Sequence, residues 1–118
     1  MSRVIAIVNQ KGGVGKTTTA INLGASFAVA ERHTLVIDMD PQGNATSGLG
    51  VNRADIDKSM YEVLVDQEPL QSAIIPHLHF KNLDLVPSDV ALVGAEVQLV
   101  EQPDREMRLR RALETVRN

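Results

Sequence analysis

The sequence predicts an α/β fold in which a parallel sheet is flanked by helices. Residues 3–8 (RVIAIV) form a continuous apolar run, which is typical of a central parallel strand covered on both faces. A glycine-rich loop and a helical pattern over 16–30 follow, and a second apolar run, TLVID, occupies 34–38. This order of strand, loop, helix and strand indicates a βαβ unit, which implies a right-handed crossover between parallel strands.

The helix expected over 16–30 has one side of mostly small residues. Ile21, Gly24, Ala25 and Ala28 recur at helical spacing along it. We therefore expect this helix to lie close to the sheet.

Shorter elements are predicted for the middle of the chain. Residues 39–58 hold one proline, several glycines and many polar groups, so we expect a loop there. The run SMYE at 59–62 is typical of a capping box that opens a short helix, and Pro69 is expected to start a further helical turn. Residues 82–86 (NLDLV) predict a third strand that ends at Pro87.

Two helices are expected near the end of the sequence. Ser88 or Asp89 is expected to cap a helix over 90–101, and Pro103 to start the last helix. The apolar residues at helical spacing in these two segments are Val93, Val97 and Val100, then Leu109, Ala112, Leu113 and Val116.

The last helix is rich in arginine, at positions Arg105, Arg108, Arg110, Arg111 and Arg117. One interpretation is a patch for nucleic acid. The other is a solvated face, with ion pairs at i,i+4 between Asp104 and Arg108 and between Glu106 and Arg110. The scarcity of aromatic residues favours the solvated face.

Composition limits the classes of protein that this chain can represent. Its 118 residues suffice for one domain, and the net charge of −3 gives no reason to expect a nucleic-acid binder. The absence of cysteine excludes disulfides and thiolate metal sites. No apolar stretch is long enough to span a membrane, so no membrane association is expected and the expected location is the cytoplasm.

The run QKGGVGKTTTA at 10–20 predicts a phosphate-binding loop. Glycines let successive backbone N–H groups turn inward, and the N-terminus of the following helix adds partial positive charge. Lys16 can then reach the β- and γ-phosphate oxygens of a nucleotide, and Thr17 can place its hydroxyl on magnesium.

Two alternatives to a nucleoside-triphosphate loop compete with this interpretation. A dinucleotide fold would use Gly13, Gly15 and a third small residue, but Thr18 stands in that third place. Asp38 could serve as its ribose-binding acid, yet Lys16 would stay unexplained. A glycine-rich turn without a ligand is the other alternative, and the GKT run between strand and helix disfavours it.

An acidic pair, Asp38 and Asp40, follows the second predicted strand. The carboxyl ends of parallel strands meet at one edge of a sheet, so this pair should face the phosphate loop. The carboxylates could hold magnesium through water or orient an attacking water. The alternative is a structural turn that begins at Asp40-Pro41 and is completed by Gly43.

Three segments resemble one family of P-loop ATPases. An ordinary Walker A loop needs glycine where Gln10 stands, whereas KGGVGKT at 11–17 resembles the deviant Walker A motif of the ParA/MinD class. DMDPQGN at 38–44 resembles the ParA/Soj branch of chromosome and plasmid partition ATPases, because MinD-like proteins usually lack PQGN. LDLVPSDVALVGAE at 83–96 is also similar to a ParA segment.

This resemblance implies a role for each matching residue. The residues that would bind ATP are Lys11, Gly12, Gly13, Val14, Gly15, Lys16, Thr17 and Thr18. Thr17 would ligate magnesium and Asp38 would support the metal site. Lys16 and Asp40 would serve hydrolysis, and Lys11 would reach across a dimer interface to the partner's nucleotide.

The resemblance also implies partners. ATP would hold together a nucleotide-sandwich homodimer that binds DNA without sequence preference. A ParB-type protein would stimulate hydrolysis and release the DNA. A chain that retained DNA binding would be associated with the nucleoid.

The sequence departs from the family in two places. Glu31 stands where a glycine usually ends the first helix, and a left-handed cap costs more there with glutamate. His33 is expected to be a surface turn residue and not a ligand, because no second histidine or acid stands at helical spacing from it.

The second departure is a missing apolar strand that ends in an acid, the Walker B element. We therefore expect residues 1–118 to be the N-terminal part of a ParA-like P-loop ATPase domain (AAA/CbiA-type), truncated before that strand and slow in hydrolysis. The alternatives are a non-catalytic fragment that pairs with a full-length relative, or another deviant Walker A ATPase such as a MinD-like one.

Overall fold

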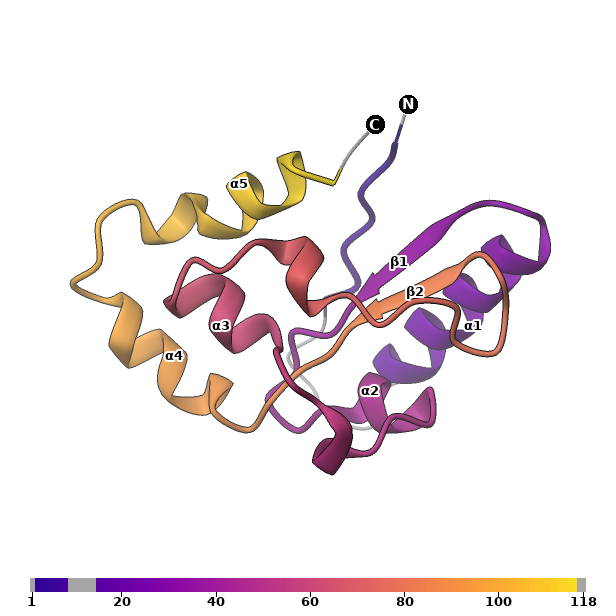
Figure 1. The fold of residues 1–118 in the computed structure, drawn as a ribbon, viewed down its shortest axis with the longest axis horizontal. Helices are drawn as coiled ribbons and strands as arrows, with labels where there is room; N and C mark the ends of the chain where they lie inside the picture. Colours follow the sequence, from indigo (N-terminus) through magenta and orange to yellow (C-terminus); the bar gives the residue numbers. More distant parts are fainter. Residues whose placement is uncertain (1, 9–14, 117–118) are drawn as a thin grey trace.

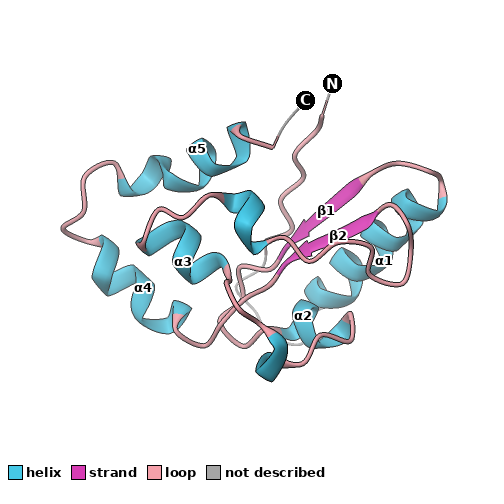
Figure 2. Ribbon diagram, in the orientation of Figure 1, coloured by secondary structure: helices cyan, strands magenta, loops and turns pink. Residues whose placement is uncertain are grey.

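A computed structural model describes residues 2–8 and 15–116. Figure 1 and Figure 2 show an α/β arrangement in which helices lie on both sides of a small sheet. The sheet pairs β1 (Thr34–Ile37) with β2 (Leu83–Val86) in parallel, from Thr34 opposite Leu83 to Ile37 opposite Val86. The predicted parallel sheet and the second and third predicted strands are thereby confirmed.

The strand predicted over 3–8 is wrong for this structure. Residues 2–8 have no regular secondary structure, and the side chain of Val8 is 82% exposed. A strand needs a neighbour for its backbone N–H and C=O groups, and among the described residues the paired strands are β1 and β2. The apolar composition of this run is therefore not sufficient to make it a strand here.

Helix α1 (Lys16–Val29) covers one face of the sheet, as predicted. Gly24 is buried against β1, where an added Cβ would lie 2.9 Å from Cγ2 of Val36. The core on this face consists of Ala28, Leu49, Leu83 and Leu85, with Ile21, Val36, Val51 and Leu78 packed against it. The small side of the helix allows this close approach.

Helix α1 ends on a left-handed residue, also as predicted. Glu31 has φ 62°, and its N–H donates to the Ala28 carbonyl at 3.0 Å. The N–H of Arg32 donates to the Phe27 carbonyl at 2.9 Å. These two bonds form the Schellman motif, with glutamate in the position that usually carries glycine.

The other face of the sheet is covered by α3 (Met60–Val65), η2 (Leu70–Ala73), α4 (Leu92–Leu99) and α5 (Arg108–Glu114). The capping box of α3 is confirmed, because the Ser59 hydroxyl accepts from the backbone and Glu62 accepts from the Ser59 N–H. The buried core on this face consists of Met60, Val63, Leu64, Leu70, Ala73, Val86, Leu92 and Ala95. Leu109, Ala112, Leu113 and Val116 pack against it, so the apolar side of the last helix is confirmed.

Two short helices occupy the segment predicted as a loop over 39–58. They are α2 (Asn44–Gly48) and the 3₁₀ turn η1 (Arg53–Asp55). Gly43 adopts a left-handed φ of 68°, and its carbonyl accepts the N–H of Ser47 at 2.9 Å. The sequence conceals α2 because asparagine, threonine, serine and glycine all have low helix propensity.

Neither predicted residue caps α4, because its N-cap is Ala91, which makes no side-chain cap bond. The Asp89 carboxylate accepts the Ala91 N–H at 2.8 Å, whereas the Ser88 hydroxyl donates to the Asp40 carbonyl. Val93, Val97 and Val100 share a face of this segment, but that face is exposed, and Leu92 and Ala95 make the core contacts.

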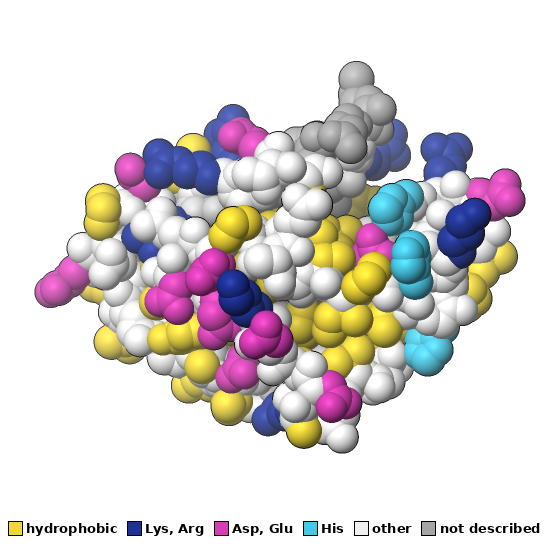
Figure 3. Space-filling view, in the orientation of Figure 1, with side chains coloured by type: hydrophobic (Ala, Val, Ile, Leu, Met, Phe, Trp, Pro, Cys, Tyr) yellow, Lys and Arg dark blue, Asp and Glu magenta, His cyan; other side chains and the backbone are white. Residues whose placement is uncertain are grey.

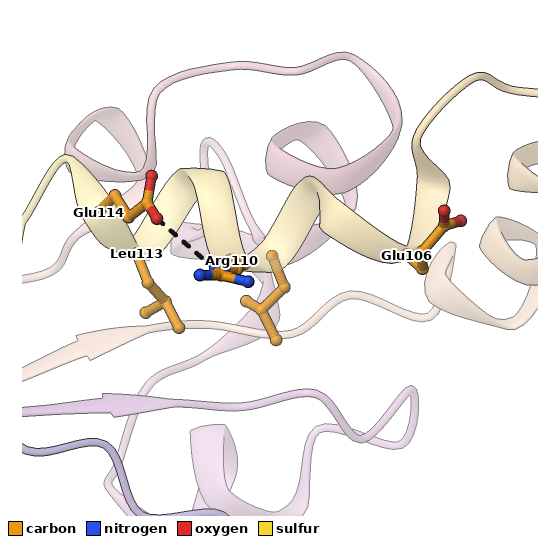
Figure 4. Close-up of a pocket in the computed structure, with 5 residues that line it drawn as sticks. Glu106, Arg110, Leu113 and Glu114 are labelled. Atoms are coloured by element: carbon orange, nitrogen blue, oxygen red, sulfur yellow. Dashed lines mark ion pairs between the residues drawn. The ribbon is translucent and has the colours of Figure 1, made fainter.

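The predicted ion pairs of the last helix are wrong. The chain forms a 3₁₀ turn, η3 (Arg105–Met107), before α5, and Asp104 has a left-handed φ of 56°. The continuous helical spacing that i,i+4 pairs require is therefore broken. Arg110 pairs instead with Glu114 at 3.6 Å, the pair that the dashed line marks in Figure 4, and Glu106 lies in the preceding turn η3. Arg111 pairs with Asp104 at 3.3 Å.

Arg108 does not belong to a solvated face either. It is 5% exposed and donates to the carbonyl oxygens of Leu64 at 2.8 Å and Val65 at 3.0 Å. These carbonyls belong to the last turn of α3, which lacks intrahelical donors. Arg108 thus joins α5 to the C-terminus of α3.

His33 lies on the surface, but it has an acidic partner. Its Nε2 lies 2.7 Å from Oδ2 of Asp84, and its side chain is 68% exposed. In Figure 3 the histidine side chains gather on the side of the molecule where the strands begin. The sequence conceals this pair because Asp84 lies on β2, 51 residues away.

Among the described residues, none of the helices combines the length and apolar character needed to cross a membrane.

Candidate functional site

The N-terminus of α1 carries the described part of the glycine-rich loop. Gly15 caps the helix with a left-handed φ of 84°, and Lys16, Thr17 and Thr18 are its first helical residues. An added Cβ on Gly15 would meet nothing within 4 Å, so glycine is favoured there by backbone conformation and not by lack of space.

This geometry suits an anion. The first N–H groups of a helix have no intrahelical acceptor, and the helix dipole favours negative charge there. The Gly15 carbonyl already accepts the Thr19 N–H at 2.8 Å, which fixes the first turn. Four of the predicted phosphate-binding residues, Lys11, Gly12, Gly13 and Val14, lie outside the described residues.

Asp38 lies at the carboxyl end of β1 and is 3% exposed. Its N–H continues the ladder to the Val86 carbonyl at 3.1 Å. Its Oδ1 accepts the Asp40 N–H at 3.0 Å, and its Oδ2 accepts both the N–H of Thr46 at 2.8 Å and the Thr46 hydroxyl at 2.6 Å. Asp38 therefore ties the end of the strand to α2.

Asp40 forms the turn that the sequence offered as the structural alternative. Its carbonyl accepts the Gly43 N–H at 2.8 Å, and its Oδ1 accepts the Gln42 N–H at 3.0 Å. Its Oδ2 accepts from Nδ2 of Asn44 at 3.0 Å. The Asp40 residue is only partly buried, so the turn holds the carboxylate in place without enclosing it.

The acidic loop is attached to the phosphate-loop helix through α2. Figure 1 places α2 beside the first part of α1, at the end of the molecule toward which both strands point. The contact is close, because an added Cβ on Gly48 would lie 2.5 Å from Cδ1 of Ile21. The short helix that follows the acidic pair is thus packed against α1.

Two residues at this edge were missed by the sequence analysis. Thr46 bonds to Asp38 through both its N–H and its hydroxyl, and Ser88 bonds to both Thr46 and Asp40. Their positions gave a weak signal, since only Ser88 directly follows the end region of a strand, whereas Thr46 lies within α2. Within residues 2–8 and 15–116, no group of three or more His, Cys, Asp or Glu side chains could hold a metal ion.

Known proteins are similar to this chain over nearly its whole length. A family model described as "AAA domain" (AAA_31) matches residues 2–118. The sporulation initiation inhibitor protein Soj of Bacillus subtilis is 51% identical over 99% of this chain, and the chromosome partitioning protein ParA of Myxococcus xanthus is 56% identical over 96%. These matches lie in the N-terminal parts of the relatives.

Two solved structures are also similar to this chain over most of its length. Cobyrinic acid a,c-diamide synthase from Mycobacterium smegmatis, with bound ATP analog and magnesium, superposes with a TM-score of 0.90 and 37% identity over 98% of this chain. A plasmid partition protein from Borrelia burgdorferi superposes with a TM-score of 0.76 and 32% identity over 92%.

The chain spans less than half the length of the proteins that it matches. It covers 46% of Soj, 40% of the Myxococcus ParA, 47% of the synthase chain and 48% of the Borrelia chain.

Proposed function

The chain belongs to the AAA domain family AAA_31, and on this premise we propose that it is the ATP-binding segment of a ParA/Soj-type partition ATPase. The observation that carries the proposal is the start of α1. There Lys16 and Thr17 directly follow a left-handed glycine at the end of a GGVG run. A phosphate chain with a magnesium ion is the ligand that this combination of charge, hydroxyl and N–H groups recognises.

The residues present fit magnesium-ATP. Lys16 would bind the phosphate oxygens together with the backbone of residues 12–18, and the Thr17 hydroxyl would ligate magnesium. Magnesium usually keeps several waters and takes few protein ligands, so a site without a carboxylate cluster suits it. When bound, it would neutralise charge on the phosphates.

The acidic loop would serve the same nucleotide. Three donors already occupy the Asp38 oxygens, and a carboxylate offers about four lone-pair sites, so Asp38 would support the metal through water. Asp40 would orient the attacking water, since its partly exposed carboxylate is held by a turn.

Dimerisation and DNA binding complete the proposal. Lys11 would reach the nucleotide of a second copy, so that ATP binding favours a homodimer. The dimer would bind DNA without sequence preference in the cytoplasm, and a ParB-type protein would stimulate its release. The similarity to Soj and ParA supports this part.

Equilibrium binding of radiolabelled ATP in the presence of magnesium tests the central claim. We expect Lys16→Ala to lose binding. Lys58→Ala is the matched control, because Lys58 pairs with Glu68 at 3.4 Å outside the proposed site, and this variant should bind as wild type does. Equal binding by wild type and Lys16→Ala would refute the assignment.

We expect residues 1–118 alone to hydrolyse ATP slowly, since they span less than half the length of the relatives that they match. Turnover at the rate of a full-length relative, abolished by Asp40→Ala, would contradict this expectation.

A second candidate function is a non-catalytic fragment that associates with a full-length relative. The observation in its favour is the exposure of Val4, Ile5 and Val8, since apolar side chains that solvent reaches favour association with another chain. Co-purification with a full-length ParA-like protein would support it. A strictly monomeric chain in the presence of ATP would count against it.

A further inference from the structure

The loops that follow β1 and β2 are joined by two buried hydroxyl residues. The Ser88 N–H donates to Oγ1 of Thr46 at 3.1 Å, and the Ser88 hydroxyl donates to the carbonyl oxygen of Asp40. Thr46 and Ser88 are each 2% exposed. Because their partners lie more than 40 residues away in sequence, these bonds fix how the two loops sit against each other.

The Thr46 hydroxyl has a single possible orientation in this network. A hydroxyl has one proton to donate, and an ionised carboxylate can only accept. Thr46 therefore donates to Oδ2 of Asp38 at 2.6 Å and accepts from the N–H of Ser88 at 3.1 Å. Two hydrogen bonds therefore run in sequence, from the N–H of Ser88 to Thr46 and from the hydroxyl of Thr46 to Asp38. Because both donate in the same direction, each one strengthens the other.

Ser88 itself is held by a rigid part of the fold. The preceding residues, Val86 and Pro87, are fully buried. The Val86 carbonyl accepts from the Asp38 N–H at 3.1 Å, and the Pro87 carbonyl accepts from the Met60 N–H at 2.9 Å. The end of β2 is thus a fixed support, from which Ser88 reaches the acidic loop.

The bonds of Asp40 divide into two sets. Its carboxylate accepts from Gln42 and Asn44, which belong to the same loop. Its main-chain N–H donates to Asp38 and its carbonyl accepts from Ser88, two residues that lie just past the ends of β1 and β2, and the same carbonyl accepts the N–H of Gly43 within the turn. The direction in which the carboxylate points therefore depends on these main-chain bonds as well as on its own.

We propose that Ser88 and Thr46 are positioning residues for Asp40, and that they hold its carboxylate in the orientation needed for ATP hydrolysis. Ser88 acts directly on the Asp40 carbonyl, and Thr46 acts through Asp38 and Ser88. Neither residue is assigned a contact with the nucleotide. This inference rests on the proposed function, since it assigns a role within that reaction.

Amide hydrogen exchange without nucleotide tests the network itself. Ser88→Ala should raise the exchange rate of the Gln42 and Gly43 amides about tenfold, which corresponds to the loss of one hydrogen bond. Ser88→Thr keeps the hydroxyl and should exchange as wild type does. Thr46→Val and Thr46→Ser form the second matched pair, read at the Asp40 amide. Unchanged exchange in both Ser88→Ala and Thr46→Val would overturn the proposal.

Single-turnover hydrolysis with protein in excess over magnesium-ATP tests the functional role. We expect Ser88→Ala to slow hydrolysis about tenfold while the Kd for ATP changes less than twofold, and Ser88→Thr to restore the rate. A purely structural residue would not separate rate from affinity in this way. An unchanged rate in Ser88→Ala, or a rate that Ser88→Thr fails to restore, would overturn the positioning role.

The two proposals fail in different ways. Absence of ATP binding by the wild-type chain would overturn the proposed function and the positioning role together. Normal ATP binding with an unaffected rate in Ser88→Ala would overturn the positioning role alone.

Discussion

Gly24 of α1 and Val36 of β1 are in direct contact, since a Cβ added to Gly24 would lie only 2.9 Å from Cγ2 of Val36. Real Cβ atoms essentially never approach so closely, and valine has a stiff χ1 that cannot easily move away. The distance between the phosphate-loop helix and the sheet is therefore set by the absence of a side chain at this position.

Replacing this glycine should destabilise the protein. Gly24→Ala is expected to lower the free energy of unfolding by about 2 kcal/mol, because the clash with Val36 exceeds the gain in helix propensity. Gly94→Ala is the matched control, since an added Cβ there meets only Gln98, at 3.9 Å. It should stabilise α4 by up to about 1 kcal/mol. Urea unfolding measures both values, and a stabilised Gly24→Ala would contradict the packing described.

The end of α1 offers a stabilising substitution. Glu31 holds a φ of 62°, which a residue with a Cβ adopts at a cost of about 1 kcal/mol. Glu31→Gly should recover that energy and raise the denaturation midpoint. Glu31→Ala retains the strained backbone, so it should stay within about 0.5 kcal/mol of wild type. Equal midpoints for the glycine and alanine variants would show that the cap is not strained.

The buried arginine of α5 should matter far more than its exposed neighbour. Arg108→Met leaves the Leu64 and Val65 carbonyls without their donor, and we expect a loss of about 2 kcal/mol in the free energy of unfolding. Arg110→Met removes only an exposed ion pair with Glu114 and should cost less than about 0.5 kcal/mol. Thermal unfolding of the two variants checks this difference, and similar melting temperatures would refute it.

The capping box of α3 can be tested in the same way. Ser59→Ala removes the acceptor for the Tyr61 N–H, and caps of this kind contribute about 1 kcal/mol. Ser72→Ala removes only an exposed bond to the Pro69 carbonyl and should have a small effect. Guanidinium unfolding of both variants gives the comparison. A Ser59→Ala protein as stable as Ser72→Ala would show that the box adds nothing.

Features that depend on neighbours in sequence could be predicted from it. The capping box at Ser59, the left-handed Glu31 and the close approach of Gly24 each follow from a short run of residues. The βαβ order was equally accessible, because two apolar runs flank one helical pattern.

Features that depend on distant partners could not be predicted. The run at residues 2–8 has the composition of a strand, but a strand also requires a hydrogen-bonded neighbour. Arg108 appeared to belong to a charged surface, because the carbonyls that it binds lie 43 and 44 residues earlier in the chain. In the same way, the motif located Asp38 and Asp40, but not the hydroxyls of Thr46 and Ser88 that hold them.

Strand β2 has a consequence for the order in which this protein assembles. Val86 belongs to the core on one face of the sheet, and Leu83 and Leu85 belong to the core on the other. During synthesis, α1 and β1 leave the ribosome well before this strand and have no partner strand to pair with. Neither core can close until residues 83–86 have emerged, so α1 and β1 must wait without their final packing until that point of translation.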